Sequence, residues 1–416
     1  MDCRLLLLPW KNRKQAAVFF TSTPPFAMKE LFVVEPVCHR MEHVPFNAAL
    51  LQTLTCAYPG RKISFFGECS HVDNLVEFLP VEISRIIRWH KVVIPGRRLC
   101  PYDRFRQERV LVSRLEQAGL GGKCSQLIVS CGTSTIIWAI KLSGGYWRRS
   151  FACQVVLHGL LSSLAGWRSK NPLRRLVDLR GALTRFNRKN IQFVVLEEHI
   201  EDALLALLPQ LRPYVEEIDH PVVSLTGNSG SEALPGGRVC FGFLGLATKS
   251  KGFHAFVEIA SSIKEEFGDK AEFRAIGKIP QYEPCSVDLS CLDMPPALEQ
   301  LPRREYEKRL EGVHYLVFPY SEEHYLLTAS GALLDAVAFS KPIVASRINL
   351  FTQLKQAGGS VIFADDKKSF LAVIRQLIYH FNREQYLQQS QGMETVSRQR
   401  APENLALDVQ QRWKTS

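Results

Sequence analysis

The chain has 416 residues, of which 46% are hydrophobic and 22% are charged. These are ordinary values for a globular protein, so they exclude a disordered or fibrous chain, and the length predicts about two domains. Lysine and arginine number 52 against 41 acidic residues, which gives a net charge of +11 at pH 7. Such an excess favours anionic partners: nucleotides, phosphorylated lipids, a membrane surface or nucleic acid.

The 11 cysteines include no Cys-x-x-Cys pair. Neither a disulfide framework nor a zinc site is indicated, so we expect no metal and a reducing, cytoplasmic compartment. The Leu5–Leu8 run is too short for a signal peptide. The apolar stretch Thr135–Gly166 is interrupted by Lys141, Arg148 and Arg149 and is therefore not expected to span a membrane. We expect a soluble or peripheral protein.

Short apolar runs alternate with helical stretches in the first half of the chain, the pattern of an α/β protein. Helices are predicted over Phe46–Ala57 and Pro172–Phe186. The predicted strands are Leu31–Val37, Lys62–Phe66, Gln126–Ser130, Gln154–His158 and Gln192–Leu196.

Residues Ser224–Gly237 are rich in glycine and serine, which predicts a linker over residues 226–237 between domains at 1–225 and 238–395. In the second domain the predicted helices are Gly252–Glu266, Arg303–Leu310, about Thr328 to Phe339, Leu350–Gln356, Lys368–Phe381 and Arg383–Gln391. The predicted strands are Val239–Leu244, Ala271–Ile276, Val313–Phe318, Pro342–Ser346 and Gly359–Phe363. Strands this apolar predict parallel sheets covered on both faces, and hence two Rossmann-like domains.

A lysine-containing turn follows the first predicted strand of the second domain. The segment from Gly245 to Phe253, which includes Lys249 and Lys251, leaves that strand and opens a helix. Backbone N–H groups and the helix dipole add to an ammonium charge at such a place, so the turn is a candidate anion site. A solvated surface lysine is an equally good interpretation of this turn alone.

A second segment, Val317–Ser346, runs through strand, loop, helix and strand. The small residues Ser330, Gly331 and Ala332 fall at the predicted helix start, where a phosphate can approach the backbone closely. Asp335 lies one turn further on among apolar neighbours, at a depth suited to the two hydroxyls of a ribose. The alternative for Asp335 is an ordinary exposed helix residue.

Together these two segments resemble the donor domain of GT-B glycosyltransferases, above all the retaining "group 1" enzymes of family 4. The resemblance covers roughly residues 238–365, and its most specific part is Asp-Ala-Val-Ala-Phe-Ser-Lys-Pro-Ile-Val-Ala, from Asp335 onward. It implies the α/β GT-B fold, with two Rossmann-like domains facing each other across a cleft. It also implies that a C-terminal helix over residues 396–416 returns to the N-terminal domain.

The resemblance implies residue roles as well. Lys251, helped by Lys249, would hold the donor diphosphate, and Ser330, Gly331 and Ala332 would offer backbone near the distal phosphate. Asp335 matches the second acid of the family's Glu-seven-residues-Glu motif, which binds ribose. The position of the first Glu is Leu327, with Glu322 or Glu323 as a substitute from the loop, and Leu246 stands where the family commonly has an arginine.

In the first half, the segment from Cys38 to Asn47 follows a predicted strand and opens a helix. Open α/β sheets place their ligands at such loops, so His43 and Glu42 are the candidate catalytic residues, orienting an acceptor hydroxyl or contacting the donor sugar. His158, at the end of another predicted strand, holds a similar position. Surface polar residues, or a buried histidine for His158, are the alternative interpretations.

Two basic clusters lie in the first half, with few acids among them. They suit an anionic membrane surface or a lipid-pyrophosphate acceptor, and no recognised nucleic-acid module accompanies them. The alternative for both clusters is an ordinary solvated basic face. The members of the first are Arg85, Arg88, Lys91, Arg97, Arg98, Arg104, Arg106 and Arg109, and those of the second are Arg148, Arg149, Arg168, Lys170, Arg174, Arg175, Arg180, Arg185, Arg188 and Lys189.

From these patterns we expect a cytoplasmic glycosyltransferase that contacts the inner face of the membrane. It would move a sugar from a UDP- or GDP-sugar to a hydroxyl of a saccharide or lipid-linked acceptor, as in polysaccharide or glycolipid assembly, with no required cofactor. Three alternatives stay open: a nucleotide-sugar-binding protein without transferase activity, a nucleotide-sugar epimerase or hydrolase, and, less favoured, a nucleic-acid-binding protein.

Overall fold

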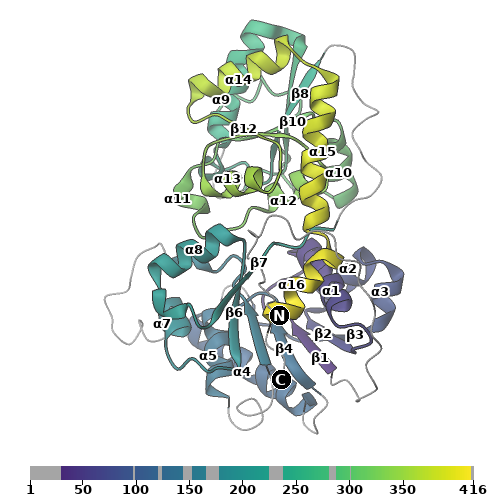
Figure 1. Cartoon of the computed structure of the whole chain (residues 1–416), viewed down its shortest axis with the longest axis vertical. Helices are drawn as coiled ribbons and strands as arrows, with labels where there is room; N and C mark the ends of the chain where they lie inside the picture. The colour runs from purple at the N-terminus through teal and green to yellow at the C-terminus, as the bar shows by residue number, and fades with distance from the viewer. Residues whose placement is uncertain are drawn as a thin grey trace, which may run out of the picture.

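The computed structural model of the chain folds into two α/β domains stacked along its long axis (Figure 1). It describes residues 30–96, 99–119, 124–143, 152–164, 178–223, 238–280, 287–299 and 301–413. Each domain contains one parallel sheet with helices on both faces, so the predicted fold class is confirmed.

The N-terminal sheet has seven strands in the order β3-β2-β1-β4-β5-β6-β7, and every neighbouring pair is parallel. The order changes direction between β1 and β4, because the chain builds outward to β3 on one side and to β7 on the other. The strands are β1 (Glu30–Val34), β2 (Ile63–Gly67), β3 (Ile87–Lys91), β4 (Cys124–Val129), β5 (Ala152–Val156), β6 (Ile191–Leu196) and β7 (Val215–Ile218).

Alternate residues of β1 enter different cores, which explains why the run is apolar throughout. Leu31 and Val33 pack on the face covered by α1, whereas Phe32 and Val34 pack on the opposite face with α4, α5 and α7. Burying each such side chain stabilises the fold by about 1.5–3 kcal/mol. The helices of this domain are α1 (Val44–Ala57), α2 (Cys69–Phe78), α3 (Val81–Ile86), α4 (Pro101–Gly119), α5 (Ser134–Leu142), α7 (Leu179–Thr184) and α8 (Glu198–Leu207), with 3-10 turns at Leu161–Leu164 and Pro209–Leu211.

The C-terminal sheet is parallel with the strand order β12-β11-β10-β8-β9, and its order changes direction between β8 and β10. Its strands are β8 (Val239–Leu244), β9 (Ala271–Ile276), β10 (Tyr315–Phe318), β11 (Ile343–Ala345) and β12 (Val361–Phe363). Its helices are α9 (Phe253–Phe267), α10 (Arg303–Glu311), α11 (Glu322–Tyr325), α12 (Gly331–Ala338), α13 (Asn349–Gln356), α14 (Lys367–Tyr379) and α15 (Arg383–Gln399), with 3-10 turns at Lys249–Lys251 and Gly268–Lys270.

The last helix, α16 (Pro402–Arg412), leaves the C-terminal domain and packs against α1 of the N-terminal domain (Figure 1). Ala406, Val409 and Trp413 are buried there in the core beside β1 and α1. At the crossing, the buried Arg400 makes hydrogen bonds of 2.5 and 2.7 Å to both carboxylate oxygens of Glu197, just after β6. Arg400 therefore fixes the point at which the chain passes back between the domains.

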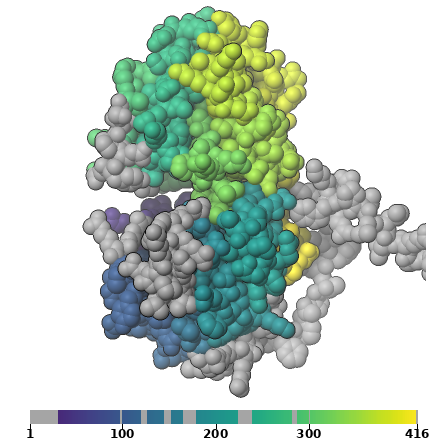
Figure 2. All heavy atoms as spheres, turned by 90° about the vertical axis from the view of Figure 1, so that its left-hand side faces the viewer, coloured from purple at the N-terminus to yellow at the C-terminus, as the bar shows by residue number. Residues whose placement is uncertain are grey.

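The domains also touch directly on one side and leave a groove between them on the other (Figure 2). On the closed side, the Gln353 side chain of α13 accepts a hydrogen bond of 3.0 Å from the backbone N–H of His199 in α8. Leu327, in the loop after α11, is buried within a hydrophobic cluster of the N-terminal domain. None of the described helices is both long and apolar enough to cross a membrane.

The structure corrects several predicted elements. The first strand ends at Val34, so Glu35–Val37 belong to the loop that follows it. The edge strands β3 and β7 were not predicted, because charged residues at positions that are not buried interrupt the apolar pattern of both. Within Pro172–Phe186 the described residues form only α7, and the predicted linker over residues 226–237 lies outside the described residues.

Candidate functional site

The turn after β8 depends on two glycines in left-handed conformations. Gly245 has φ +95° and Gly252 has φ +72°. A Cβ on Gly252 would collide with the carbonyl oxygen of Pro319, so glycine lets this turn lie against the loop that follows β10. The side chain of Thr248 accepts a hydrogen bond of 3.3 Å from the N–H of Lys251 and closes the 3-10 turn. The loops after β8 and β10 thus meet where the strand order changes direction, which is the usual ligand position in open α/β sheets.

Lys251 and the first turn of α12 lie together beside Gly245. A Cβ on Gly245 would lie 3.6 Å from Lys251 Nζ and 3.9 Å from the Cβ of Ala332. Ser330 caps α12, since its Oγ accepts a hydrogen bond of 3.3 Å from the N–H of Leu333. Nothing in the described structure lies within 4 Å of the place where Gly331 would carry a Cβ. The start of α12 is therefore open beside a lysine ammonium.

The ammonium of Lys251 has no counter-ion in the described part of the chain, where no hydrogen bond or ion pair to it is found. Burial lowers its pKa from the ordinary value of a lysine. A desolvated cation beside helix N–H groups is a site for an anion, because an anion there restores the lost solvation. Lys249, in the same turn, is exposed.

Asp335 lies one turn into α12 and faces α10. Its Oδ2 accepts a hydrogen bond of 2.7 Å from the Tyr306 hydroxyl, and its Oδ1 lies 3.3 Å from Arg303 Nη1. Burial raises the pKa of Asp335, while Arg303 and Tyr306 lower it, and the net shift is upward. The Asp335 side chain keeps 25% of its surface exposed, so each oxygen can accept a further hydrogen bond.

The family motif has a glutamate where this chain has Leu327, and neither Leu327 nor the nearby Glu322 and Glu323 lies with the Lys251 turn. Leu327 points into the N-terminal core with 3% exposure, so it does not face solvent as a carboxylate would. Glu323 is exposed on α11, and among the described residues no hydrogen bond or ion pair connects it to the Lys251 turn. Glu322 lines a small hollow between the domains with His199 and Asn349. The structure thus brings together Lys251, Gly331 and Ala332, but not Glu323.

In the N-terminal domain, Glu42 and His43 lie in the loop between β1 and α1. Glu42 Oε2 accepts a hydrogen bond of 3.2 Å from the N–H of His39, so this carboxylate closes its own loop. His43 is the first residue before α1, has φ 51°, and makes no capping hydrogen bond with its side chain. The His43 side chain is therefore available for other contacts.

Three histidine rings are in contact at this place. The ring of His158, after β5, stacks on His43 with centroids 4.2 Å apart and meets His220 edge-on at 5.4 Å. Burial lowers the pKa of His158 well below its ordinary value and that of His220 to about 3, so both rings are neutral. Within the described residues, Nδ1 of His158 is buried without a hydrogen-bond partner.

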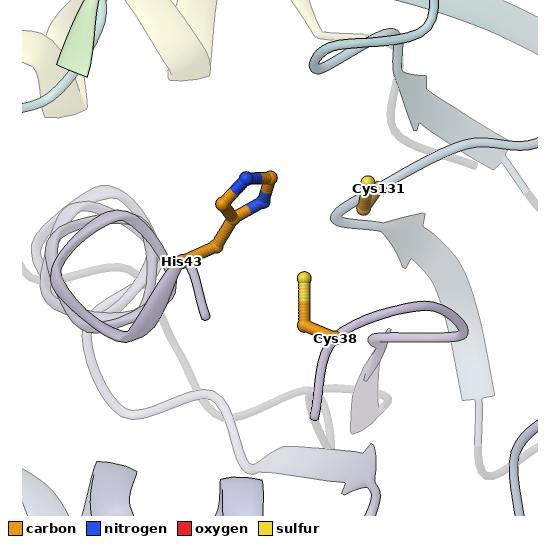
Figure 3. Close-up of side chains that lie close together, drawn as sticks. All are labelled: Cys38, His43 and Cys131. Carbon is orange, nitrogen blue, oxygen red and sulfur yellow. The ribbon is translucent and has the colours of Figure 1, made fainter. Parts of the chain in front are cut away.

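Two cysteines approach His43 from neighbouring strand ends (Figure 3). Cys38 follows β1 and Cys131 follows β4, and ligand atoms of Cys38, His43 and Cys131 all lie within 4.8 Å of one another. Hydrogen bonding between the thiols raises the pKa of Cys38 and lowers that of Cys131. Burial lowers the pKa of His43, but its hydrogen bond with Cys131 and the nearby negative charges raise it more, to above its ordinary value.

This cysteine cluster was missed at the level of sequence because its members are far apart in the chain. The available signal was that Cys38 and Cys131 each directly follow a predicted strand. Only the strand order, with β1 beside β4, brings these two strand ends together.

The basic clusters are partly neutralised where the structure describes them. Arg88 pairs with Glu30 at 3.3 Å, Lys91 with Asp73 at 2.6 Å and Arg104 with Glu108 at 3.7 Å. The members outside the described residues are Arg97, Arg98, Arg148, Arg149, Arg168, Lys170, Arg174 and Arg175.

The turn after β8 and the start of α12 lie within a segment that matches a known family. Residues 238–380 match the family described as "Glycosyl transferases group 1". The C-terminal domain is a group 1 glycosyltransferase domain. This match spans the β8 turn, Lys251 and α12, so the resemblance derived from those segments is confirmed, and with it the expected enzyme class.

Solved structures extend the likeness from the glycosyltransferase domain to the fold of the whole chain. Sucrose-phosphate synthase from Thermosynechococcus elongatus is 13% identical, with a TM-score of 0.62 over 92% of this chain and 98% of that one. The catalytic domain of starch synthase IV from Arabidopsis thaliana, bound to ADP and acarbose, is 11% identical, with a TM-score of 0.61 over 92% and 100%.

A third similar structure is Anabaena Alr3699/HepE in complex with UDP. It is 12% identical, with a TM-score of 0.55 over 92% of this chain and 98% of that one. At these identities the likeness establishes the GT-B fold of the chain and nothing more. No curated protein matches the chain in sequence.

Proposed function

We propose that this protein transfers a sugar from a nucleoside-diphosphate sugar to a hydroxyl group of a saccharide or lipid-linked acceptor. The observation that carries the proposal is the half-buried Lys251 ammonium, without a counter-ion in the described structure, beside the open N-terminus of α12. A diphosphate supplies the negative charge that this place lacks. The group 1 family match over the same segment supports a sugar nucleotide as the source of that diphosphate.

In the proposed reaction the bond between the sugar and the diphosphate breaks, and negative charge develops on the departing diphosphate. Lys251 and the N–H groups of Gly331 and Ala332 stabilise that charge, and they need no rearrangement because the fold already holds them. Lys249 adds a second, exposed positive charge at the turn. Asp335 accepts hydrogen bonds from the ribose hydroxyls while Tyr306 and Arg303 hold its carboxylate in place.

The acceptor lies on the opposite side of the groove, against the loop that holds Glu42 and His43. In each domain these residues follow the strands at which the strand order changes direction, the usual ligand position in open α/β sheets, and this supports the arrangement. His43 orients the acceptor hydroxyl, and Glu42 fixes the loop through His39. We further propose a uridine or guanosine diphosphate as the donor nucleotide, and an assembly role in cell-surface polysaccharide or glycolipid.

The basic N-terminal surface supports an acceptor carried on an anionic membrane. Arg185 and Lys189 are exposed near α7, and each such residue close to anionic lipid contributes about 1 kcal/mol. The protein then works at the inner face of the membrane as a peripheral enzyme.

The proposal is tested by measuring thermal stability with UDP, GDP, dTDP, ADP, CMP and their sugars. A nucleotide at 100 times its dissociation constant stabilises the native state by about 2.7 kcal/mol. We expect stabilisation by one base, lost in Lys251→Ala and kept in Lys264→Ala, whose lysine on α9 pairs with Asp293 instead. Stabilisation by no nucleotide contradicts the proposal.

A second function is favoured by one specific observation, the burial of Leu327 where the family has a glutamate. A protein with this change can bind a sugar nucleotide without transferring the sugar. Product analysis with the stabilising donor distinguishes these functions: a glycoside indicates the transferase, free sugar a hydrolase, an epimer an epimerase, and an unchanged donor a binding protein.

A further inference from the structure

The Cys38, His43 and Cys131 side chains converge on one point from three separate segments (Figure 3). Cys38 comes from the loop after β1, His43 from the start of α1 and Cys131 from the loop after β4, and one ligand atom of each lies within 4.8 Å of the others. A tetrahedral ion bound by two thiolates and an imidazole needs these atoms roughly 3.5–3.8 Å apart. Small rotamer adjustments of the three side chains reach that spacing.

A buried carboxylate forms hydrogen bonds with both of the loops that carry the cysteines. Glu35, with 0% exposure, accepts hydrogen bonds from the N–H groups of Val37 at 2.9 Å and Cys38 at 3.0 Å. Its other oxygen accepts a hydrogen bond of 2.8 Å from the hydroxyl of Ser130, the residue before Cys131. Glu35 thus connects both thiol-bearing segments and adds a negative charge that favours a cation between them.

The His43 segment is held in a conformation that costs free energy. Arg40 and His43 both have φ 51°, in the left-handed region that residues other than glycine rarely adopt. His71 stabilises this conformation, since its Nδ1 donates a hydrogen bond of 2.9 Å to the Arg40 carbonyl and its Nε2 accepts one from Asn47 at 2.9 Å. Asn47 in turn donates to Glu35 at 3.1 Å. This network holds the backbone on both sides of His43, at Arg40 and at Asn47.

The ligand chemistry selects the class of ion. Two thiols and one imidazole suit zinc and other soft or borderline ions, whereas magnesium and calcium require oxygen ligands. Three protein ligands leave one of four tetrahedral positions open, as in catalytic zinc sites. His43 is the solvent-exposed member, while Cys38 and Cys131 are buried, so the ion is reached from the His43 side.

We propose that Cys38, His43 and Cys131 bind one zinc ion, with a fourth position open to an oxygen ligand. Binding replaces the protons of the two thiols and changes no oxidation state. The site lies where the order of the N-terminal sheet changes direction, the place assigned above to the acceptor. It makes His43 a zinc ligand, and His43 then acts on an acceptor hydroxyl through the open position of the ion. Zinc binding itself does not depend on the proposed transfer reaction.

The test uses the full chain, stripped with a chelator under reducing conditions and titrated with Co²⁺ in place of Zn²⁺. We expect one ion per chain, a thiolate-to-cobalt charge-transfer band and the intense visible bands of a tetrahedral site, all removed by added Zn²⁺. Cys38→Ser and Cys131→Ser each reduce the charge-transfer band by about half or abolish it. Changing residues that only support metal ligands weakens affinity about 10–100-fold, so His43→Ala is expected to weaken it at least that much.

Cys56→Ser is the matched control, because Cys56 is an exposed cysteine on the helix that begins after His43. It should keep the spectrum and the affinity. Circular dichroism establishes that each variant is folded, and His43→Ala keeps the test decisive if a buried serine unfolds the chain. Absence of a tetrahedral cobalt spectrum, a spectrum unchanged in His43→Ala, or a Cys38–Cys131 disulfide that persists under the reducing conditions overturns the proposal. None of these measurements requires sugar transfer.

Discussion

The two points where strand order changes direction, one in each domain, carry different chemistry. In the C-terminal domain the loops after β8 and β10 present an ammonium and an open helix N-terminus, which suit a diphosphate. In the N-terminal domain the loops after β1 and β4 present two thiols and an imidazole around a buried carboxylate. The same topology therefore creates two ligand positions, and the side chains alone decide what each one binds.

The two sites also differ in how their residues are spread along the chain. Lys251 follows β8 by a few residues, and Asp335 lies on the helix that follows β10, so both stand in recognisable local motifs. Cys38 and Cys131 have no local motif in common, and they meet only because β1 pairs with β4. Sequence motifs therefore find the first kind of site far more readily than the second.

Lys251→Ala is expected to cause the largest loss of activity and to affect only the C-terminal site. Removing one preorganised group that stabilises transition-state charge lowers kcat about 100- to 1,000-fold. Steady-state kinetics with the donor identified by thermal stability measures this, while cobalt binding at the N-terminal site stays unchanged. A variant that retains full activity removes Lys251 from the site.

Arg400→Ala is expected to lower the free energy of unfolding, because Arg400 fixes the point at which the chain passes back from the C-terminal to the N-terminal domain. It leaves the carboxylate of Glu197 buried without its partner, which costs about 3–5 kcal/mol. Urea unfolding followed by circular dichroism measures the loss. Arg398→Ala, whose arginine is exposed near the end of α15 and pairs with Glu394, should change stability by less than about 1 kcal/mol. Equal effects of the two variants contradict a special role for Arg400.

Asp335→Ala is expected to weaken nucleotide binding by about 10–100-fold, the value of a hydrogen bond to a charged group. Isothermal titration calorimetry measures the affinity. Glu307→Ala is the control, because Glu307 pairs with Arg303 at 2.6 Å but does not contact Asp335 through any hydrogen bond in the described structure. Affinity at the wild-type level in Asp335→Ala contradicts the ribose assignment.

The pH dependence of nucleotide binding gives a further test of Lys251. Burial lowers the pKa of its ammonium, and only the charged form attracts the diphosphate. Affinity should be constant below that pKa and fall about tenfold per pH unit above it, at a lower pH than an exposed lysine would give. Lys251→Arg keeps its charge and should lack this decline. The same fall in Lys251→Arg as in the wild type assigns the dependence to another group.

The last effect concerns the basic surface of the N-terminal domain. We expect co-sedimentation with anionic vesicles and none with neutral vesicles, weakened in Arg185→Gln/Lys189→Gln by about 2 kcal/mol for the two charges. Binding that is the same for both vesicle types contradicts an electrostatic membrane contact.

Much of the fold was predictable from the chain because buried parallel strands are apolar on both faces. The predicted strands Lys62–Phe66 and Ala271–Ile276 correspond closely to β2 and β9. The polar edge strand β3 was not predictable in this way, since only one side of an edge strand is paired. The GT-B fold and the group 1 family followed from the resemblance around Lys251 and Asp335. The roles of all the site residues, Lys251 and Asp335 as well as His43, Glu42 and Glu323, stay predictions.

The sequence by itself determined the α/β class, the positive net charge and the lysine turn next to its strand, because each is a local or additive property of the chain. Only the tertiary structure decided that Leu327 joins the core of the other domain and that Asp335 is held by Tyr306. It also decided that Cys38 meets Cys131, because strand order sets which strand ends are neighbours.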